Sequence, residues 1–136
     1  MKRELLKEIA VKLSPSGRAI DREGFLSAVL AVSVGSITGD PDSATLAVTL
    51  THADTSDGDF TPVPDTMIDP ERRAWEGGIR KIVVSDQEEL CLSMDLLGCK
   101  RFIKVTPAIT FTGGTTPKAD TAAYALILGD PVSSPV

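Results

Sequence analysis

Apolar runs recur along the chain, and one of them, at residues 44–53, alternates apolar and polar positions with the period of two that a half-buried β-strand shows. In residues 44–53, Leu46, Val48 and Leu50 alternate with threonines. Similar runs rich in Val, Ile and Leu predict further strands at 26–37, 79–85, 89–96, 101–111 and 121–129. Segments containing Gly, Pro and Asp separate these runs. Strands of similar length joined by short turns predict an all-β fold, an antiparallel sandwich or barrel.

The N-terminal residues do not share this clear pattern. Leu5, Leu6, Ile9 and Leu13 fit a short amphipathic helix, whereas Ile9, Val11 and Leu13 alternate as a strand does. Residues 3–13 therefore stay open between helix and strand. We expect a flexible arm at 1–15 followed by a strand, a β-sandwich domain at 16–131 and an extended C-terminal tail at 132–136.

Length and composition fit one globular domain: 136 residues, 42% hydrophobic and 24% charged. No run approaches the roughly 18–20 apolar residues of a membrane span, and residues 1–13 lack the apolar core of a signal peptide. A net charge of −5 argues against binding to a nucleic-acid backbone. Eight acids and no Lys or Arg lie between Asp40 and Glu71, while the first 23 residues hold six basic side chains against four acids. Such asymmetry orients a protein on a complementary partner, or simply reflects solvated acidic loops.

Two cysteines, Cys91 and Cys99, are too few for a disulfide framework. We expect buried reduced thiols, with a disulfide between them as the alternative. This cysteine usage is typical of an intracellular or disulfide-independent protein.

The stretch "LTHADTSDGDFTPV" (50–63) holds the one histidine of the chain, His52, and three aspartates. A calcium loop needs a glutamate six residues after its glycine, but Pro64 stands at that position. Asp57-Gly58 is instead a strong hairpin pair, in which we expect glycine to supply a positive φ angle. His52 has no Ser or Cys partner in a nucleophile motif, so a structural or exposed role is expected.

The remaining polar motifs predict no catalytic, cofactor-binding or metal-binding residue. The segment "TGGTT" (112–116) lacks the lysine and helix of a phosphate-binding loop, so we expect a loop joining two strands. Glu88 and Glu89 are expected to be solvated at a strand entrance. The chain is therefore predicted not to be an enzyme and to use no small-molecule substrate.

The segment 61–78 is long for a connection in a compact β domain, and long loops are often functional. It contains Met67, Ile68, Arg72, Arg73 and Trp75. Trp, Arg and Met are enriched at protein interfaces, which makes these residues candidates for contact with a partner. The alternative is that Trp75 covers the core from this loop.

Four stretches, in this order, carry a resemblance to a known family: "IDREGFLSAVLAVSVGSIT", "LAVTLTHADTSDGDFTPV", "DLLGCKRFIKVTPAITFTGGTTP" and "AAYALILGDP". Over residues 18–131 the chain resembles the capsid decoration, or cement, proteins of tailed bacteriophages. The resemblance lies in strands and turns and carries over no individual binding residue. Residues 64–78 match least well.

The resemblance implies a jelly-roll-like β-sandwich that binds the outer surface of the assembled phage head across junctions between major capsid protein subunits. It implies a virion location after synthesis in the host cytoplasm. We expect the basic arm (Lys2, Arg3 and Lys7) and the loop around Trp75 to contact the capsid or another copy, and we expect a homo-dimer or trimer. The alternatives are a head–tail joining or tail protein, and a carbohydrate-binding sandwich, for which the 4% aromatic content is low.

Overall fold

The computed structural model describes residues 9–13, 15–64, 75–120 and 122–131. The regular secondary structure in these residues consists of β-strands. In chain order the strands are β1 (Ala10–Leu13), β2 (Ile20–Asp21), β3 (Phe25–Ser33), β4 (Ser36–Thr38), β5 (Ser43–Ala53), β6 (Thr61–Pro62), β7 (Trp75–Glu76), β8 (Ile79–Val84), β9 (Glu89–Asp95), β10 (Phe102–Thr112), β11 (Lys118–Asp120) and β12 (Ala123–Pro131). The all-β prediction is confirmed.

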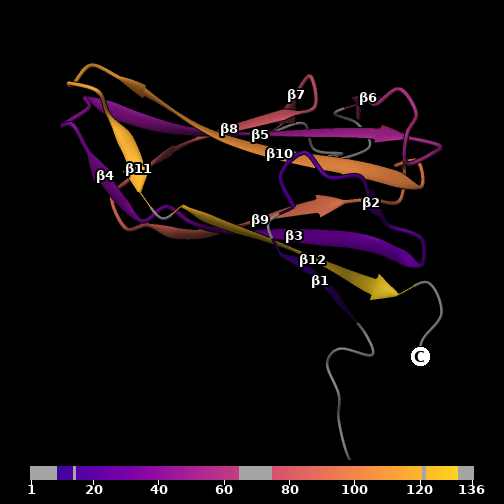
Figure 1. Ribbon diagram of the computed structural model, residues 1–136. Helices are drawn as coiled ribbons and strands as arrows, with labels where there is room; N and C mark the ends of the chain where they lie inside the picture. Colours follow the sequence, from indigo (N-terminus) through magenta and orange to yellow (C-terminus); the bar gives the residue numbers. More distant parts are fainter. Residues whose placement is uncertain (1–8, 14, 65–74, 121, 132–136) are drawn as a thin grey trace, which may run out of the picture.

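Two antiparallel sheets lie face to face and form a sandwich (Figure 1). The four-stranded sheet has the order β1-β12-β3-β9. The larger sheet has the order β2-β10-β5-β8-β7, with β6 beside β5. At one end of the sandwich, β4 and β11 pair as a separate two-stranded ribbon.

The main strands pair in a nested way. β5 pairs with β8, β3 with β9, β2 with β10, and β1 with β12, so each pair encloses the previous one in sequence. The innermost and third pairs belong to the larger sheet, and the second and outermost pairs belong to the four-stranded sheet. The chain therefore runs as one long folded-over hairpin whose successive pairs fall alternately in the two sheets.

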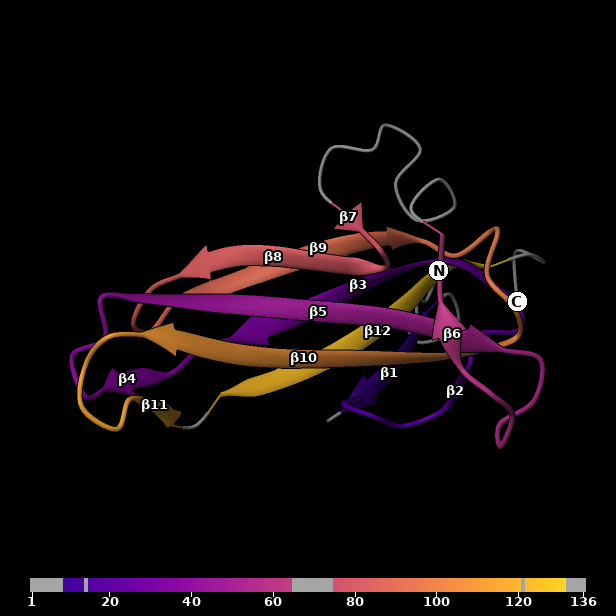
Figure 2. The same cartoon turned by 90° about the horizontal axis from the view of Figure 1, so that it is seen from above.

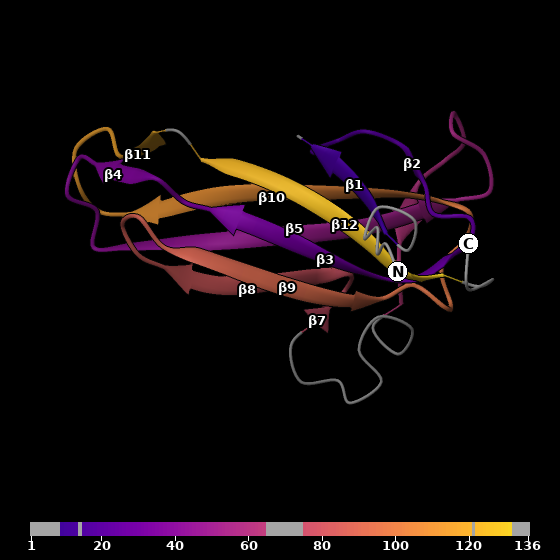
Figure 3. The same cartoon turned by 90° about the horizontal axis from the view of Figure 1, so that it is seen from below.

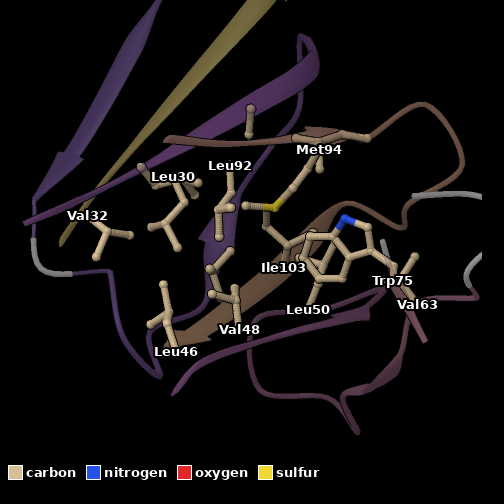
Figure 4. Close-up of a cluster of buried hydrophobic side chains, with 14 of the residues drawn as sticks. Leu30, Val32, Leu46, Val48, Leu50, Val63, Trp75, Leu92, Met94 and Ile103 are labelled. Carbon is tan, nitrogen blue, oxygen red and sulfur yellow. The ribbon is translucent and has the colours of Figure 1, made fainter. Parts of the chain in front are cut away.

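The core is built by strict alternation along the long strands. β5 and β10 pair over eleven residues, from Ala53 opposite Phe102 to Ser43 opposite Thr112. Along β5 the even-numbered residues from Ala44 to His52 are buried, because their side chains point toward the other sheet. Figure 4 shows the side chains that meet between the sheets, including Leu30, Val32, Leu92 and Met94 opposite Leu46, Val48, Leu50 and Ile103.

The strand predictions hold, with two differences. The apolar run 26–37 is broken, because Gly35 takes a φ of 72° and the chain leaves the four-stranded sheet for the ribbon. Residues 10–13, open between helix and strand, form strand β1 paired with β12. The arm expected at 1–15 therefore contributes a strand to the sandwich, and residues 1–8 lie outside the described residues.

Candidate interaction surfaces

Most residues predicted to contact a partner lie outside the described residues: Lys2, Arg3, Lys7, Met67, Ile68, Arg72 and Arg73. Trp75 is described, and its side chain is only 5% exposed. It sits in β7 opposite Arg80 and packs in the core near Val63 and Leu50 (Figure 4). Of the two roles considered for Trp75, its burial favours covering the core over offering a surface to a partner.

His52 holds a turn in place. It is 7% exposed, and its Nδ1 accepts a hydrogen bond of 3.1 Å from the Lys100 backbone N–H. Burial lowers the pKa of His52, and the positive charge of Lys100 lowers it further, whereas Asp54 acts in the opposite direction. The neutral imidazole is therefore the form that fits, since a protonated Nδ1 cannot accept this bond. Of the two roles expected for His52, structural or exposed, its burial and this hydrogen bond favour the structural one.

Arg22 also stabilises this turn by hydrogen bonds to backbone carbonyls. Its guanidinium donates to the backbone carbonyls of Cys99, Lys100 (3.1 Å) and Phe25 (3.4 Å). The neighbouring Arg101 makes a two-pronged contact with Asp21, at 3.1 Å and 2.9 Å. The hydrogen bond from Arg101 is the main reason that the pKa of Asp21 is lowered. These contacts are structural, because they connect β2 to the start of β10.

The Asp57-Gly58 segment is a turn, as predicted, within a loop that joins β5 to β6. The predicted positive φ at Gly58 is wrong, since this residue is not among those with positive φ. Gly58 is the fourth residue of the turn, and its N–H donates to the Thr55 carbonyl at 3.2 Å. A Cβ at Gly58 would lie 2.6 Å from Thr55 Oγ1, so a larger residue there would require the Thr55 side chain to move.

The "TGGTT" segment is the loop between β10 and β11, as predicted. Gly114 has a φ of 79°, and a Cβ there would lie 2.4 Å from the Gly39 carbonyl oxygen. The Thr115 N–H donates to the same oxygen at 2.8 Å. Two glycine turns thus pack backbone against backbone, which leaves no cradle for a phosphate.

Figure 2 views the molecule from the side of the larger sheet. The outward positions of β5 and β10 in this sheet are rich in threonine. By register, Thr110 lies opposite Thr45 and Thr106 opposite Thr49, so hydroxyls and methyls alternate over two long strands. Near one end of this face the Lys104 ammonium lies 4.2 Å from the centre of the Phe60 ring. This face is of the kind that a solvated sheet presents.

Figure 3 views the molecule from the side of the four-stranded sheet. The central outward positions of this sheet differ from those of the larger sheet, because most of them are apolar. One row across the sheet runs Val11, Ile127, Val29 and, at the β9 edge, the polar Ser93. The next row consists of Leu13, Ala125, Ala31 and Cys91. Their side chains point away from the core, since the alternate residues of β3, β9 and β12 are the buried ones. Val11 is 43% and Leu13 69% exposed. We call these two rows the apolar face.

Polar residues bound the apolar face at both ends. Ser33 and Glu89 lie opposite each other at one end, and Ser27 and Asp95 at the other. Asp130 lies close to Ser27, whose hydroxyl donates to the Asp130 carboxylate at 2.6 Å. An apolar centre with a polar rim is the anatomy of a protein interface.

A groove of about 650 Å³ opens on the apolar face at its Glu89 end. Leu13, Ala31, Ala125 and Cys91 contribute to its lining together with Leu90 and Tyr124. The groove is shallow and apolar, with one charged residue, Glu89, in its lining. It can accept an apolar side chain or segment, and it lacks the convergent polar groups that orient a reacting substrate.

The apolar face escaped the sequence reasoning, although a signal for it was present. The runs "SAVLAV" in β3 and "AYALIL" in β12 are apolar on both parities, not on one. A strand of that kind is typically covered on both of its faces. The residues on the second parity are Val29, Ala31, Ala125 and Ile127, and they belong to the apolar face.

The two cysteines are free thiols in different environments. Cys99 is buried, as predicted, and burial raises the pKa of its thiol to about 11. The predicted burial of Cys91 is wrong: it is exposed, because it occupies an outward position of β9 on the apolar face.

The described residues contain no group of three or more His, Cys, Asp or Glu side chains placed to hold a metal ion. A search of the same residues finds no helix long and apolar enough to cross a membrane. No family model, curated protein or solved structure matches this chain.

Proposed function

We propose that this chain is a structural virion protein, a cement protein that binds the outside of an assembled phage head and stabilises contacts between major capsid protein subunits. The observation that carries the proposal is the apolar face, an exposed surface that the chain does not use for its own core. Large exposed apolar patches with polar rims mark surfaces that bind other macromolecules.

The strand order supports a jelly-roll assignment. Nested pairs that alternate between two packed sheets form a folded-over hairpin rolled into a sandwich, which is the arrangement of a jelly roll. Jelly rolls are common in viral capsid and lectin domains. The fold alone does not select a function, so the surfaces decide between candidates.

The two outer faces differ in chemistry, and this suits a protein that bridges neighbours. The apolar face offers Val11, Val29 and Ile127, whereas the opposite face offers threonine hydroxyls. A rigid sandwich between them holds both faces in fixed orientation. A capsid lattice repeats the same sites many times, so contacts that are weak singly become strong together.

Carbohydrate binding receives less support. Stacking on sugars needs free aromatic faces, but Lys104 lies over the Phe60 ring and Arg101 lies 5.2 Å from the centre of the Phe102 ring. Trp75 is buried in the core. The Phe60 and Phe102 rings are therefore covered by cationic side chains and the Trp75 ring by the core, which leaves these three rings poorly placed to stack on a sugar.

The first test is the copy number of the protein in purified particles, measured by quantitative mass spectrometry against the major capsid protein. We expect a ratio near one or a simple fraction. A handful of copies per particle would instead indicate a head–tail or tail protein, and complete absence would refute the virion assignment.

A second test uses a matched pair of variants with purified protein and empty shells. Val29→Glu places a charge in the apolar face, whereas Thr49→Glu places the same charge on the opposite sheet at an outward position. We expect Val29→Glu to reduce shell binding at least tenfold and Thr49→Glu to change it less than threefold. Equal effects would remove the apolar face from the proposal.

A further inference from the structure

The groove at the Glu89 end of the apolar face raises the question of what covers it. We propose that it receives residues 1–8 of a second copy of this chain, with Leu5 and Leu6 packed over Leu13, Ala31 and Ala125. This inference specifies the dimer or trimer expected from the resemblance, and it does not rest on the capsid contact of the proposed function. It is tested on purified protein without capsids.

The groove and the N-terminal segment match in chemistry. The groove is lined mainly by small apolar side chains, and the segment "MKRELLKE" offers two adjacent leucines flanked by the cations Lys2, Arg3 and Lys7. Acidic residues stand at both ends of the apolar face, Glu89 at the groove and Asp95 and Asp130 at the far end. Two apolar faces packed directly together would bring such acids toward each other, whereas a segment with basic side chains complements them.

The segment is also long enough. Residues 1–9 precede β1, and nine extended residues span about 30 Å. Ala10, the first residue of β1, lies opposite Leu128, and Ala125, three residues along β12, lines the groove. That separation is about 10 Å within one copy. The extended segment is about three times as long, so it can cover a groove of this size on a copy packed beside β1.

The composition of the segment favours a second copy over the same chain. To reach the groove of its own copy, the segment would have to reverse direction immediately before β1 and lie back over the sheet. Residues 1–9 contain no Gly, Pro, Asn or Asp, the residues that sharp turns use. A straight course away from β1 needs no turn, and exchange of identical segments is a low-cost route to symmetric oligomers.

The native thiol of Cys91 provides the assay, because it lines the groove. A tagged Leu6→Cys, Cys91→Ser double variant is mixed with an untagged chain that retains Cys91, and the mixture is oxidised mildly with diamide. We expect a disulfide-linked heterodimer, with peptide mapping joining position 6 of one copy to Cys91 of the other. A matched Val83→Cys, Cys91→Ser variant carries an exposed thiol on the opposite sheet and should yield at least fivefold less product.

The following outcomes would refute the proposed docking of the segment. A disulfide between position 6 and Cys91 within a single chain, obtained with Leu6→Cys alone, would overturn the second copy as the occupant. No linkage, or equal linkage from position 83, would overturn the groove as the docking site.

Light scattering gives an independent check. The wild type should have the mass of an oligomer and a Leu5→Glu, Leu6→Glu variant the mass of one chain, while circular dichroism shows the same strand content for both. A wild-type protein that is monomeric at about 100 µM, roughly ten times the Kd expected of a useful self-contact, would also refute the exchange.

These outcomes are distinct from those of the copy-number test. Linkage together with absence from virions would leave segment exchange in place and remove the cement assignment. No linkage together with a copy number near that of the capsid protein would remove segment exchange and leave the cement assignment in place.

Discussion

Replacing Leu46 by alanine tests whether β5 has the register seen in the structure. Leu46 is fully buried at the centre of β5, between Ile82 of β8 and Ile109 of β10. The substitution removes three buried carbons, which corresponds to about 2.4 kcal/mol of lost transfer free energy. The cavity left behind adds to this, so we expect the free energy of unfolding to fall by about 3–4 kcal/mol. In urea, the midpoint should then fall by roughly 2 M.

Two controls make the result specific. Leu97→Ala removes the same atoms from a side chain that is 68% exposed, so it should cost less than about 0.8 kcal/mol. Thr45→Ala alters the neighbouring residue, which points to the opposite face, and should cost less than about 1 kcal/mol. A shift of one residue in register would exchange the two faces of β5. A cost for Thr45→Ala equal to or above that for Leu46→Ala would refute the described register.

Three further predictions follow from individual side chains. His52 has a lowered pKa in the fold, so below its unfolded value of about 6.5 the unfolded chain binds the extra proton first; the free energy of unfolding should fall between pH 7.5 and 5.5, and His52→Gln should weaken this dependence. At submicromolar protein, where the proposed self-contact is open, a thiol reagent should label one cysteine per folded chain and two per unfolded chain, since Cys91 is exposed and Cys99 is buried with a pKa of about 11; rapid labelling of both cysteines in the folded protein would contradict the burial of Cys99. Gly39→Ala should cost at least about 2 kcal/mol more than Gly17→Ala, because both have positive φ but only the Cβ at Gly39 meets backbone atoms, the nearest at 2.5 Å; thermal unfolding of the two variants checks this.

The sequence was informative wherever one face of a strand is buried and the other is solvated. β5 is the clearest example, because Leu46, Val48 and Leu50 stand on one parity and threonines on the other. The turns could also be predicted from the sequence, since glycine and aspartate are favoured by the local backbone geometry of turns. For Gly58 the predicted turn was correct and the predicted positive φ was not, because the φ angle depends on the turn type that the folded chain adopts.

Non-local features could not be read in the same way. The two-residue strand β2 exists because it pairs with β10, and its own sequence carries no strand period. The break at Gly35 depends on β4 finding β11 some 80 residues later, with Thr38 opposite Lys118. Trp75 was open between core and interface because its neighbours in space, Val63 and Leu50, are set by tertiary packing.

The nested topology explains why the apolar face and the N-terminal segment occur together. Outermost pairing places β1 at the edge of the four-stranded sheet, so Val11 and Leu13 of this short strand extend the apolar rows of β12 and β3. Residues that precede β1 therefore enter the fold at the rim of the surface that we propose they cover in a second copy.

On the proposed function, the self-contact and the shell contact would reinforce each other. A short tether gives effective concentrations in the millimolar range, so a self-contact with a Kd of about 10 µM would be sparsely filled at submicromolar protein and nearly saturated between copies held side by side on a shell. Shell binding would then be cooperative in the wild type and non-cooperative in the Leu5→Glu, Leu6→Glu variant, even where the affinity of a single copy is unchanged. Self-association through the groove, whose lining does not include Val11, Val29 or Ile127, leaves these three side chains for the shell contact. It thus need not be strong in solution to matter on the capsid, because the lattice supplies the concentration that a weak contact lacks.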